Sequence, residues 1–208
     1  MPNPSITELA TQIRAAEPRC GTTRLVLIDG QAGAGKSTLT NRLAAELGGE
    51  ESGGAGTFLP DAELAEDDLV QIVHGDDLYE GWGGLSTLDD VLLDQILEPL
   101  AAGGVGEFRM WDWVHGRRSY NIRVPARRFL IVEGVGVGLP RARELAVLTV
   151  FVAAPWEVRL ARGLERDAYD DVESLWEKFE LDEQAHHART RSQDEAEVIV
   201  DGTAPIPD

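Results

Sequence analysis

The sequence has a single cysteine and no long hydrophobic run. One cysteine cannot form an internal disulfide, so Cys20 is interpreted as a small, partly buried side chain. The longest apolar runs, such as Phe129 to Val132, suit a strand and are too short to span a bilayer. Residues Met1 to Pro4 lack the basic and apolar pattern of a secretion signal. The sequence therefore predicts a cytoplasmic protein without a membrane segment.

Positive charge is also scarce. The chain has 19 Lys and Arg against 37 Asp and Glu, which gives a formal net charge of -18. Because nucleic acids and anionic membranes require a basic surface, this balance argues against both as partners. The arginines gather at Arg109 to Arg128 and at Arg159 to Arg166, and the two lysines are Lys36 and Lys178. We therefore expect a small-molecule partner near concentrated cations, and the sequence leaves monomer and homo-oligomer both open.

Strand-like apolar runs alternate with helical patterns, which predicts an α/β fold with a parallel sheet covered by helices on both faces. The five predicted strands are Arg24 to Ile28, Val70 to His74, Phe129 to Val132, Val147 to Val152 and Glu197 to Val200. Helices are predicted after the first strand, from Ser86, from Pro155 and over Val172 to Ala188. The chain is interpreted as one domain over 1–208, with a leading helix within 1–20, a mobile connection over 49–68 and a lid region over 155–170.

The strongest signal is a glycine-rich loop between the first strand and a helix. It reads Gly30-Gln31-Ala32-Gly33-Ala34-Gly35-Lys36-Ser37 and satisfies the G-x-x-x-x-G-K-[ST] pattern in full. Its backbone N–H groups and the following helix N-terminus are expected to bind the phosphates of ATP. Lys36 is expected to bridge the terminal phosphates and Ser37 to ligate Mg2+, and Thr38 completes the predicted nucleotide site.

Carboxylates follow the second and third strands. Asp76 and Asp77 follow the second strand, and Glu133 ends the third. Parallel strands gather their ligands at the carboxyl edge of the sheet, so these groups should lie near the phosphate loop. One aspartate is expected to accept a hydroxyl proton, and Glu133 to organise magnesium. Helix capping or a solvated turn is the alternative interpretation.

Arg159, Arg162 and Arg166 lie on adjoining turns of the helix after the fourth strand. Arginines so placed can close over a transferring phosphate and neutralise its charge. The alternative is a solvated helix whose arginines pair with neighbouring acidic residues.

Together these motifs resemble the uridine kinase and phosphoribulokinase branch of the phosphate-loop kinases, which includes nicotinamide riboside kinase and pantothenate kinase. The segments that carry the resemblance are Asp76 to Tyr79, Trp111 to His115, Ile131 to Gly134, Arg159 to Asp167 and Ala196 to Val200. The resemblance implies a three-layer fold of the phosphate-loop NTPases with a five-stranded parallel sheet and a lid helix. It also implies ATP and Mg2+ as cofactors and Asp76 as the catalytic base.

The same resemblance agrees with roles in catalysis, nucleotide binding and acceptor binding. Lys36, Arg162 and Arg166 would act in catalysis, and Arg159 and Arg162 would contact the nucleotide. The residues expected to bind the acceptor are Asp76, Tyr79, Trp111, Asp112, His115 and Arg166. The sequence departs from the family here: Gly81 to Leu85 replaces a His-Pro segment, His115 sits one position early, and Trp111 stands where Tyr is usual.

The sequence thus predicts an ATP-dependent kinase that phosphorylates a hydroxyl of a small metabolite, with a nucleoside as the expected acceptor. A nucleoside monophosphate kinase is one alternative, in which Arg117 and Arg123 would hold an acceptor phosphate. A nucleotide-dependent switch or ATPase is the other. Against it, the sequence has neither an Asn-Lys-x-Asp segment nor a Leu-Ser-Gly-Gly-Gln segment.

Overall fold

A parallel sheet of five strands forms the centre of the computed structural model, which describes residues 2–57, 69–167 and 171–208. The strands are β1 (Arg24–Gly30), β2 (Val70–His74), β5 (Phe129–Glu133), β6 (Ala146–Ala153) and β7 (Val198–Asp201). Their order is β2-β5-β1-β6-β7, and every neighbouring pair is parallel. The predicted fold class and all five predicted strands are confirmed, with ends that differ by at most two residues. Parts of the predicted connection (58–68) and lid region (168–170) lie outside the described residues.

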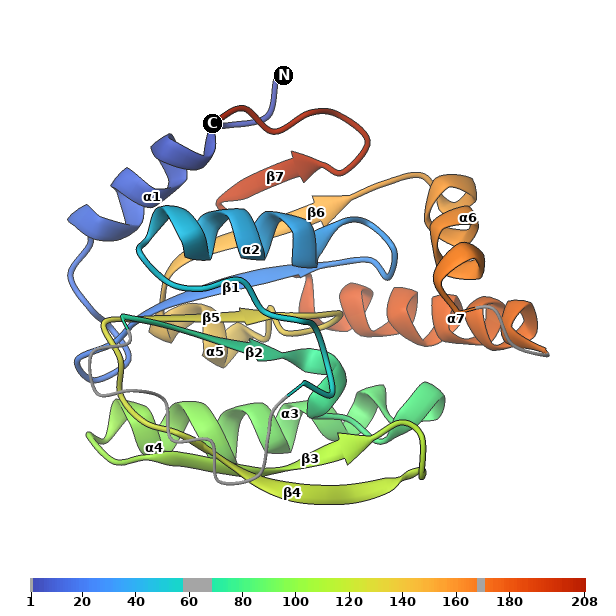
Figure 1. Ribbon diagram of the computed structural model, residues 1–208, viewed down its shortest axis with the longest axis horizontal. Coiled ribbons are helices and arrows are strands. Elements are labelled where there is room, and N and C mark those ends of the chain that lie inside the picture. The colour runs from blue at the N-terminus through green and yellow to red at the C-terminus, as the bar shows by residue number, and fades with distance from the viewer. Residues whose placement is uncertain (1, 58–68, 168–170) are drawn as a thin grey trace.

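Helices cover both faces of this sheet (Figure 1). One face carries α1 (Ile6–Ala15) and α2 (Lys36–Glu46), which pack on Val26, Ile28 and Ile131. The other face carries α5 (Pro140–Leu145) and a helical stretch that packs on Leu25, Leu27 and Val132. Successive residues of β1 therefore enter different cores, as expected for a strand buried on both faces.

The helical stretch on the second face is irregular. It consists of 3-10 turns at Gly81–Gly83 and Leu85–Thr87, α3 (Leu88–Asp90), a π-helical segment at Val91–Leu97 and α4 (Glu98–Ala101). The apolar stripe of the helix predicted from Ser86, including Leu88, Leu92 and Ile96, is buried against the sheet. The helix predicted there therefore exists, although its hydrogen bonding changes from turn to turn.

An antiparallel hairpin lies below this stretch in Figure 1 and was not predicted. It pairs β3 (Gly106–Asp112) with β4 (Arg117–Val124). Alternate residues of β3 are buried, and Phe108 and Met110 join the core on that side of the sheet. Much of the sequence-predicted arginine cluster at Arg109 to Arg128 thus belongs to the exposed face of a hairpin.

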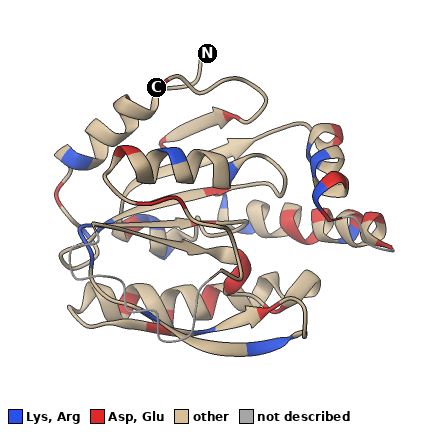
Figure 2. Ribbon diagram, in the orientation of Figure 1, with Lys and Arg blue, Asp and Glu red and all other residues tan. Residues whose placement is uncertain are grey.

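Two helices, α6 (Trp156–Arg166) and α7 (Val172–Thr190), lie beside the carboxyl ends of the strands (Figure 1). Figure 2 shows acidic residues spread over the whole ribbon, whereas Lys and Arg recur on successive turns of α6. No helix in the described part of the chain is long and apolar enough to cross a membrane. The concentration of cations on α6 directs attention to this end of the sheet.

Candidate active site

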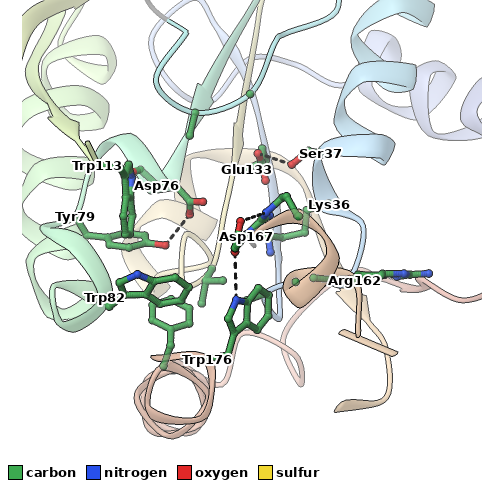
Figure 3. Close-up of a pocket in the computed structure, with 18 of the residues that line it drawn as sticks. Lys36, Ser37, Asp76, Tyr79, Trp82, Trp113, Glu133, Arg162, Asp167 and Trp176 are labelled. Atoms are coloured by element: carbon green, nitrogen blue, oxygen red, sulfur yellow. Dashed lines mark hydrogen bonds and ion pairs between the residues drawn. The ribbon is translucent and has the colours of Figure 1, made fainter. Parts of the chain in front are cut away.

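A pocket of about 1000 Å³ opens at the carboxyl edge of the sheet (Figure 3). Its described lining comes from the phosphate loop, residues 53–55 after α2, the turns after β2, the β3–β4 hairpin, the end of β5, and helices α6 and α7. Of the sequence-predicted site residues, those that line it are Ala32, Gly33, Gly35, Lys36, Ser37, Thr38, Asp76, Tyr79, Trp111, Glu133, Arg162 and Arg166. Segments far apart in sequence therefore converge on one cavity.

Glycines allow the backbone conformation of the phosphate loop. Gly30, Gly33 and Gly35 all have positive φ, at 139°, 75° and 106°. A Cβ at Gly30 would lie 2.2 Å from the Val152 carbonyl oxygen, and one at Gly33 would lie 2.6 Å from the Arg159 oxygen. Side chains are therefore excluded by both backbone conformation and space. Helix α2 begins directly at Lys36, so its N-terminus faces the loop.

Three residues of the phosphate loop, Gly30, Gln31 and Ala34, do not belong to the described pocket lining. The backbone N–H of Ala154 donates to the Gln31 side-chain oxygen at 3.3 Å. The Gln31 carbonyl accepts a hydrogen bond from Lys36 Nζ at 3.0 Å. Lys36 is 8% exposed, so its ammonium is held within the loop beside the cavity.

A second group joins α2 to the end of β5. Ser37 Oγ donates to Glu133 Oε1 at 3.0 Å, and His74 Nδ1 lies 2.6 Å from the same oxygen. Burial opposes ionisation of Glu133, but the His74 hydrogen bond and charge, together with Lys36 and Ser37, outweigh it and lower the pKa of this carboxyl. A hydroxyl beside a carboxylate provides the hard oxygen ligands that suit Mg2+, which usually takes one or two carboxylates and completes its shell with water and substrate phosphates.

Asp29, at the end of β1, was missed by the sequence interpretation. Its carboxylate accepts hydrogen bonds from the backbone N–H groups of Gly30, Gly136 and Gly138 at 2.6, 2.7 and 3.0 Å, and His187 Nε2 lies 3.3 Å away. Burial would raise the pKa of Asp29, yet the His187 contact and the backbone donors lower it to about 2. The charge therefore ties the phosphate loop to the loop after β5 and to α7. An aspartate inside an apolar strand run was the only signal.

The two adjacent aspartates occupy different environments. Asp76 lines the pocket, where its Oδ1 accepts a hydrogen bond from the Tyr79 hydroxyl at 2.6 Å (Figure 3). Asp77 is fully buried away from the described pocket lining. Its Oδ1 accepts from the Gly56 N–H at 2.7 Å, whereas its Oδ2 has no hydrogen-bond partner among the described residues. Only Asp76 is placed to meet a bound molecule.

The buried Asp77 predicts a pH-dependent stability. Burial raises its pKa from the ordinary 3.8 to about 7, although the Gly56 N–H and His74 oppose the shift. Because the folded-state pKa exceeds the unfolded one, this stabilisation is complete below about pH 4 and is lost as the pH rises through about 7. Asp77→Asn cannot ionise, so its free energy of unfolding relative to wild type should rise by up to about 4 kcal/mol between these limits. Denaturant titrations across that range test this, and a difference that does not change with pH would contradict it.

The three arginines of α6 have separate roles in the structure. Arg166 forms a two-point ion pair with Asp167, with nitrogen–oxygen distances of 2.7 and 2.8 Å, at the pocket wall. Arg162 donates to the carbonyl oxygens of Gly33 and Gly202 at 3.1 and 3.0 Å. Arg159 is 2% exposed, lies outside the described pocket lining and forms ion pairs with two glutamates of α7. The predicted contact between Arg159 and the nucleotide stays a prediction, and in the structure the guanidinium faces α7.

Aromatic side chains form much of the described pocket lining. This aromatic wall consists of Tyr79, Trp82, Trp111, Trp113, Trp176 and Phe179. Trp82 contacts three of the others, with ring centroids 5.7 to 6.1 Å apart. Tyr79 stacks on Phe179 at 6.1 Å and meets Trp113 edge-on at 6.0 Å. Such a surface suits a flat or apolar part of a ligand.

The sequence interpretation missed the contribution of α7 to this wall. Trp176 packs directly against Gly163 of α6. A Cβ at that glycine would lie 2.1 Å from the indole, so only glycine leaves room for the tryptophan. The Trp176 Nε1 donates to Asp167 Oδ2 at 3.2 Å (Figure 3). Trp176 and Phe179 are three residues apart on a helix, a spacing that also describes an ordinary core stripe. The sequence pattern alone could not distinguish these two settings.

Asp112 and His115 do not belong to the described pocket lining, and their predicted contact with the acceptor stays a prediction. Asp112 Oδ1 accepts hydrogen bonds from the Val114 and His115 N–H groups, both at 3.0 Å, and its Oδ2 lies 2.8 Å from His115 Nδ1. The His115 side chain is 62% exposed. These contacts organise the turn between β3 and β4, whereas the neighbouring Trp111 and Trp113 reach the cavity.

No family model and no curated protein matches the chain at the level of sequence. Its structure is similar to that of a candidate fructose transport system kinase from Silicibacter sp. TM1040, with a TM-score of 0.63 and 17% identity over 94% of this chain and 98% of the other. It is also similar to a candidate uridine kinase from Bacillus stearothermophilus, with a TM-score of 0.58 and 19% identity over 94% and 97%. These likenesses show that the chain has the fold of the phosphate-loop kinases.

Proposed function

We propose that the protein is an ATP-dependent kinase that transfers the γ-phosphate to a hydroxyl group of a small metabolite. One observation carries this proposal: a single pocket is lined by Lys36, Ser37 and Glu133 on one side and by Asp76 and an aromatic wall on the other. A phosphate-binding loop, a site for a hard cation and a carboxylate base are the parts that phosphoryl transfer to a hydroxyl requires.

Each part has a definite task in this mechanism. The N–H groups of the loop and the α2 N-terminus bind the phosphates, and Lys36 follows the charge that moves toward the leaving oxygen. Ser37 and Glu133 would hold Mg2+, which supplies further neutralisation of phosphate charge when bound. Asp76 accepts the proton of the acceptor hydroxyl as that oxygen attacks the γ-phosphorus. The Tyr79 hydroxyl orients the Asp76 carboxylate by donating to its Oδ1.

The pocket favours an acceptor without a phosphate group of its own. Three cations belong to its described lining: Arg166 is paired with Asp167, Arg162 holds backbone carbonyls, and Lys36 lies in the phosphate loop. Arg117 and Arg123, the residues that would hold an acceptor phosphate in a monophosphate kinase, are exposed on β4 outside that lining. The aromatic wall instead suits stacking on a flat group. A nucleoside, the acceptor that the family resemblance implies, meets both conditions.

An acceptor panel tests this function. Purified protein with ATP and Mg2+ would be assayed for ADP release in the presence of nucleosides, nucleoside monophosphates, pantothenate and sugar alcohols. We expect stimulation by a nucleoside or another uncharged alcohol, with the phosphorylated product detected by mass spectrometry. Stimulation by monophosphates alone would favour the monophosphate kinase. Hydrolysis that no acceptor stimulates and that a protein partner accelerates would favour a switch protein.

A further inference from the structure

A buried ion pair joins α6 to α7 directly behind the phosphate loop. Arg159 and Glu183 are 2% and 1% exposed, and Arg159 Nη1 lies 3.2 Å from Glu183 Oε1. Arg159 also pairs with Glu180 at 2.9 Å, and that carboxylate is 13% exposed. Burying two charges costs desolvation free energy, and their mutual attraction often does not offset that cost. A buried ion pair is therefore weak evidence that the pair stabilises the fold. Its contacts indicate another role.

Both members of this pair bind the same residue of the loop. Glu183 Oε2 accepts a hydrogen bond from the Ala32 N–H at 2.6 Å, and Arg159 Nη1 donates to the Ala32 carbonyl at 3.3 Å. Ala32 itself lines the pocket. Its neighbour Gly33 lies so close to the Arg159 backbone that no Cβ would fit. The N–H and the C=O of one loop residue are thus fixed by opposite ends of one ion pair.

Such fixation matters because the loop is rich in glycine. Glycine residues adopt many backbone conformations, and ordering them to bind a ligand costs conformational entropy. Hydrogen bonds to charged groups are stronger than those between neutral groups, so the ion pair can hold Ala32 in place before the nucleotide arrives. A preorganised loop binds its ligand more tightly because it loses less conformational entropy on binding.

The same face of α7 reaches the other half of the pocket. Phe179 lies one turn before Glu183 and stacks on Tyr79, whose hydroxyl donates to Asp76. Trp176, one turn earlier still, belongs to the aromatic wall and is drawn beside the pocket in Figure 3. One helix therefore touches both the phosphate loop and the side chain that orients the proposed base.

We propose that Glu183, acting with Arg159, is a positioning residue that fixes the phosphate loop at Ala32 and so sets where the bound nucleotide lies relative to Asp76. This inference rests on the proposed function for its meaning in catalysis, but nucleotide binding tests it directly. The loop clamp, defined as Arg159, Glu183 and Ala32, is distinct from the lid role predicted for Arg159. It acts on the loop from behind and touches neither the acceptor nor the reacting atoms.

Glu183→Gln is the first test, with Glu180→Gln as a matched control. Both variants remove one carboxylate that faces Arg159, but only Glu183 contacts the loop. We expect Glu183→Gln to raise the Kd for ATP by about tenfold or more, because it replaces the charge-assisted hydrogen bond from the Ala32 N–H with a weaker neutral one and breaks the ion pair with Arg159. Glu180→Gln should change it less than about threefold. Calorimetric titration with ATP and Mg2+ measures both, and equal effects of the two variants would overturn the proposal.

A double variant keeps the test decisive if the single change unfolds the protein. Replacing a buried ion pair by apolar residues is often neutral or stabilising, so Arg159→Met with Glu183→Leu should stay folded while the clamp is lost. We expect a wild-type or higher Tm together with weakened ATP binding. Acceptor KM should move less than ATP KM, a split that general destabilisation would not produce. A folded double variant with wild-type ATP affinity would overturn the proposal.

The outcomes for the clamp and for the proposed function can be told apart. Wild-type protein that binds ATP but phosphorylates no acceptor, with weaker binding in Glu183→Gln, would support the clamp and count against the kinase. Acceptor phosphorylation by wild type with unchanged ATP binding in Glu183→Gln would do the reverse. Failure of the wild-type protein to bind any nucleotide would overturn both.

Discussion

Lys36→Ala is expected to lower turnover by at least about a hundredfold, the effect typical of removing one group that stabilises transition-state charge. Lys36 is 8% exposed and its ammonium is held on the Gln31 carbonyl, so the residue lines the cavity from within the loop. In phosphoryl transfer the lysine bridges the terminal phosphates as charge develops on them. The described pocket lining has little other positive charge to substitute, because Arg162 and Arg166 already bind backbone oxygens and Asp167.

The other lysine provides the control for this prediction. Lys178 is exposed on α7 outside the described pocket lining, so Lys178→Ala removes the same charge from the chain without touching the site. Its turnover should equal that of wild type. Steady-state assays with the acceptor identified by the panel would compare the two variants, with thermal unfolding to show that both are folded. Near-normal turnover in Lys36→Ala would contradict the role proposed for the phosphate loop in phosphoryl transfer.

The parts of the site that sequence could predict are those encoded within a few consecutive residues. Gly30 to Ser37 has a fixed spacing because its backbone conformation and the start of α2 demand it, and the strand that precedes it is a continuous apolar run. Asp76 and Glu133 could be placed because parallel strands bring their carboxyl ends to one edge. These features are local, so a single sequence contains them.

The missed features depend on contacts between distant segments. Arg159 and Arg166 are seven residues apart on one helix and look alike in sequence, but only Arg159 meets the acidic residues of α7. Trp176 reaches the pocket because Gly163 of α6 has no side chain in its way. The sequence of α7 alone gives no sign of this space. The β3–β4 hairpin was overlooked because its exposed arginines resembled a basic ligand-binding segment. Tertiary packing decides each of these cases.

Asp76→Asn is expected to reduce turnover by about 10²–10⁴-fold while ATP binding changes little, because a positioned general base contributes about that factor. The corresponding rise in the barrier is roughly 3–5 kcal/mol. Asparagine keeps the shape of the side chain, and its Oδ1 can still accept the Tyr79 hydrogen bond that orients Asp76. What it loses is the ability to take a proton from the acceptor hydroxyl. The loss should therefore fall on kcat, with Kd for ATP nearly unchanged.

Asp77→Asn makes this a comparison between neighbours. Asp77 is fully buried, and its Oδ1 is bound to the Gly56 N–H, so it cannot reach a molecule in the pocket without a change in the turn at Gly75–Asp77. Its substitution should cost much less turnover than that of Asp76, although it changes how stability depends on pH. Single-turnover assays with saturating ATP and acceptor separate the chemical step from product release. A larger loss in Asp77→Asn would move the base to that residue. Small losses in both variants would place proton transfer outside this pair.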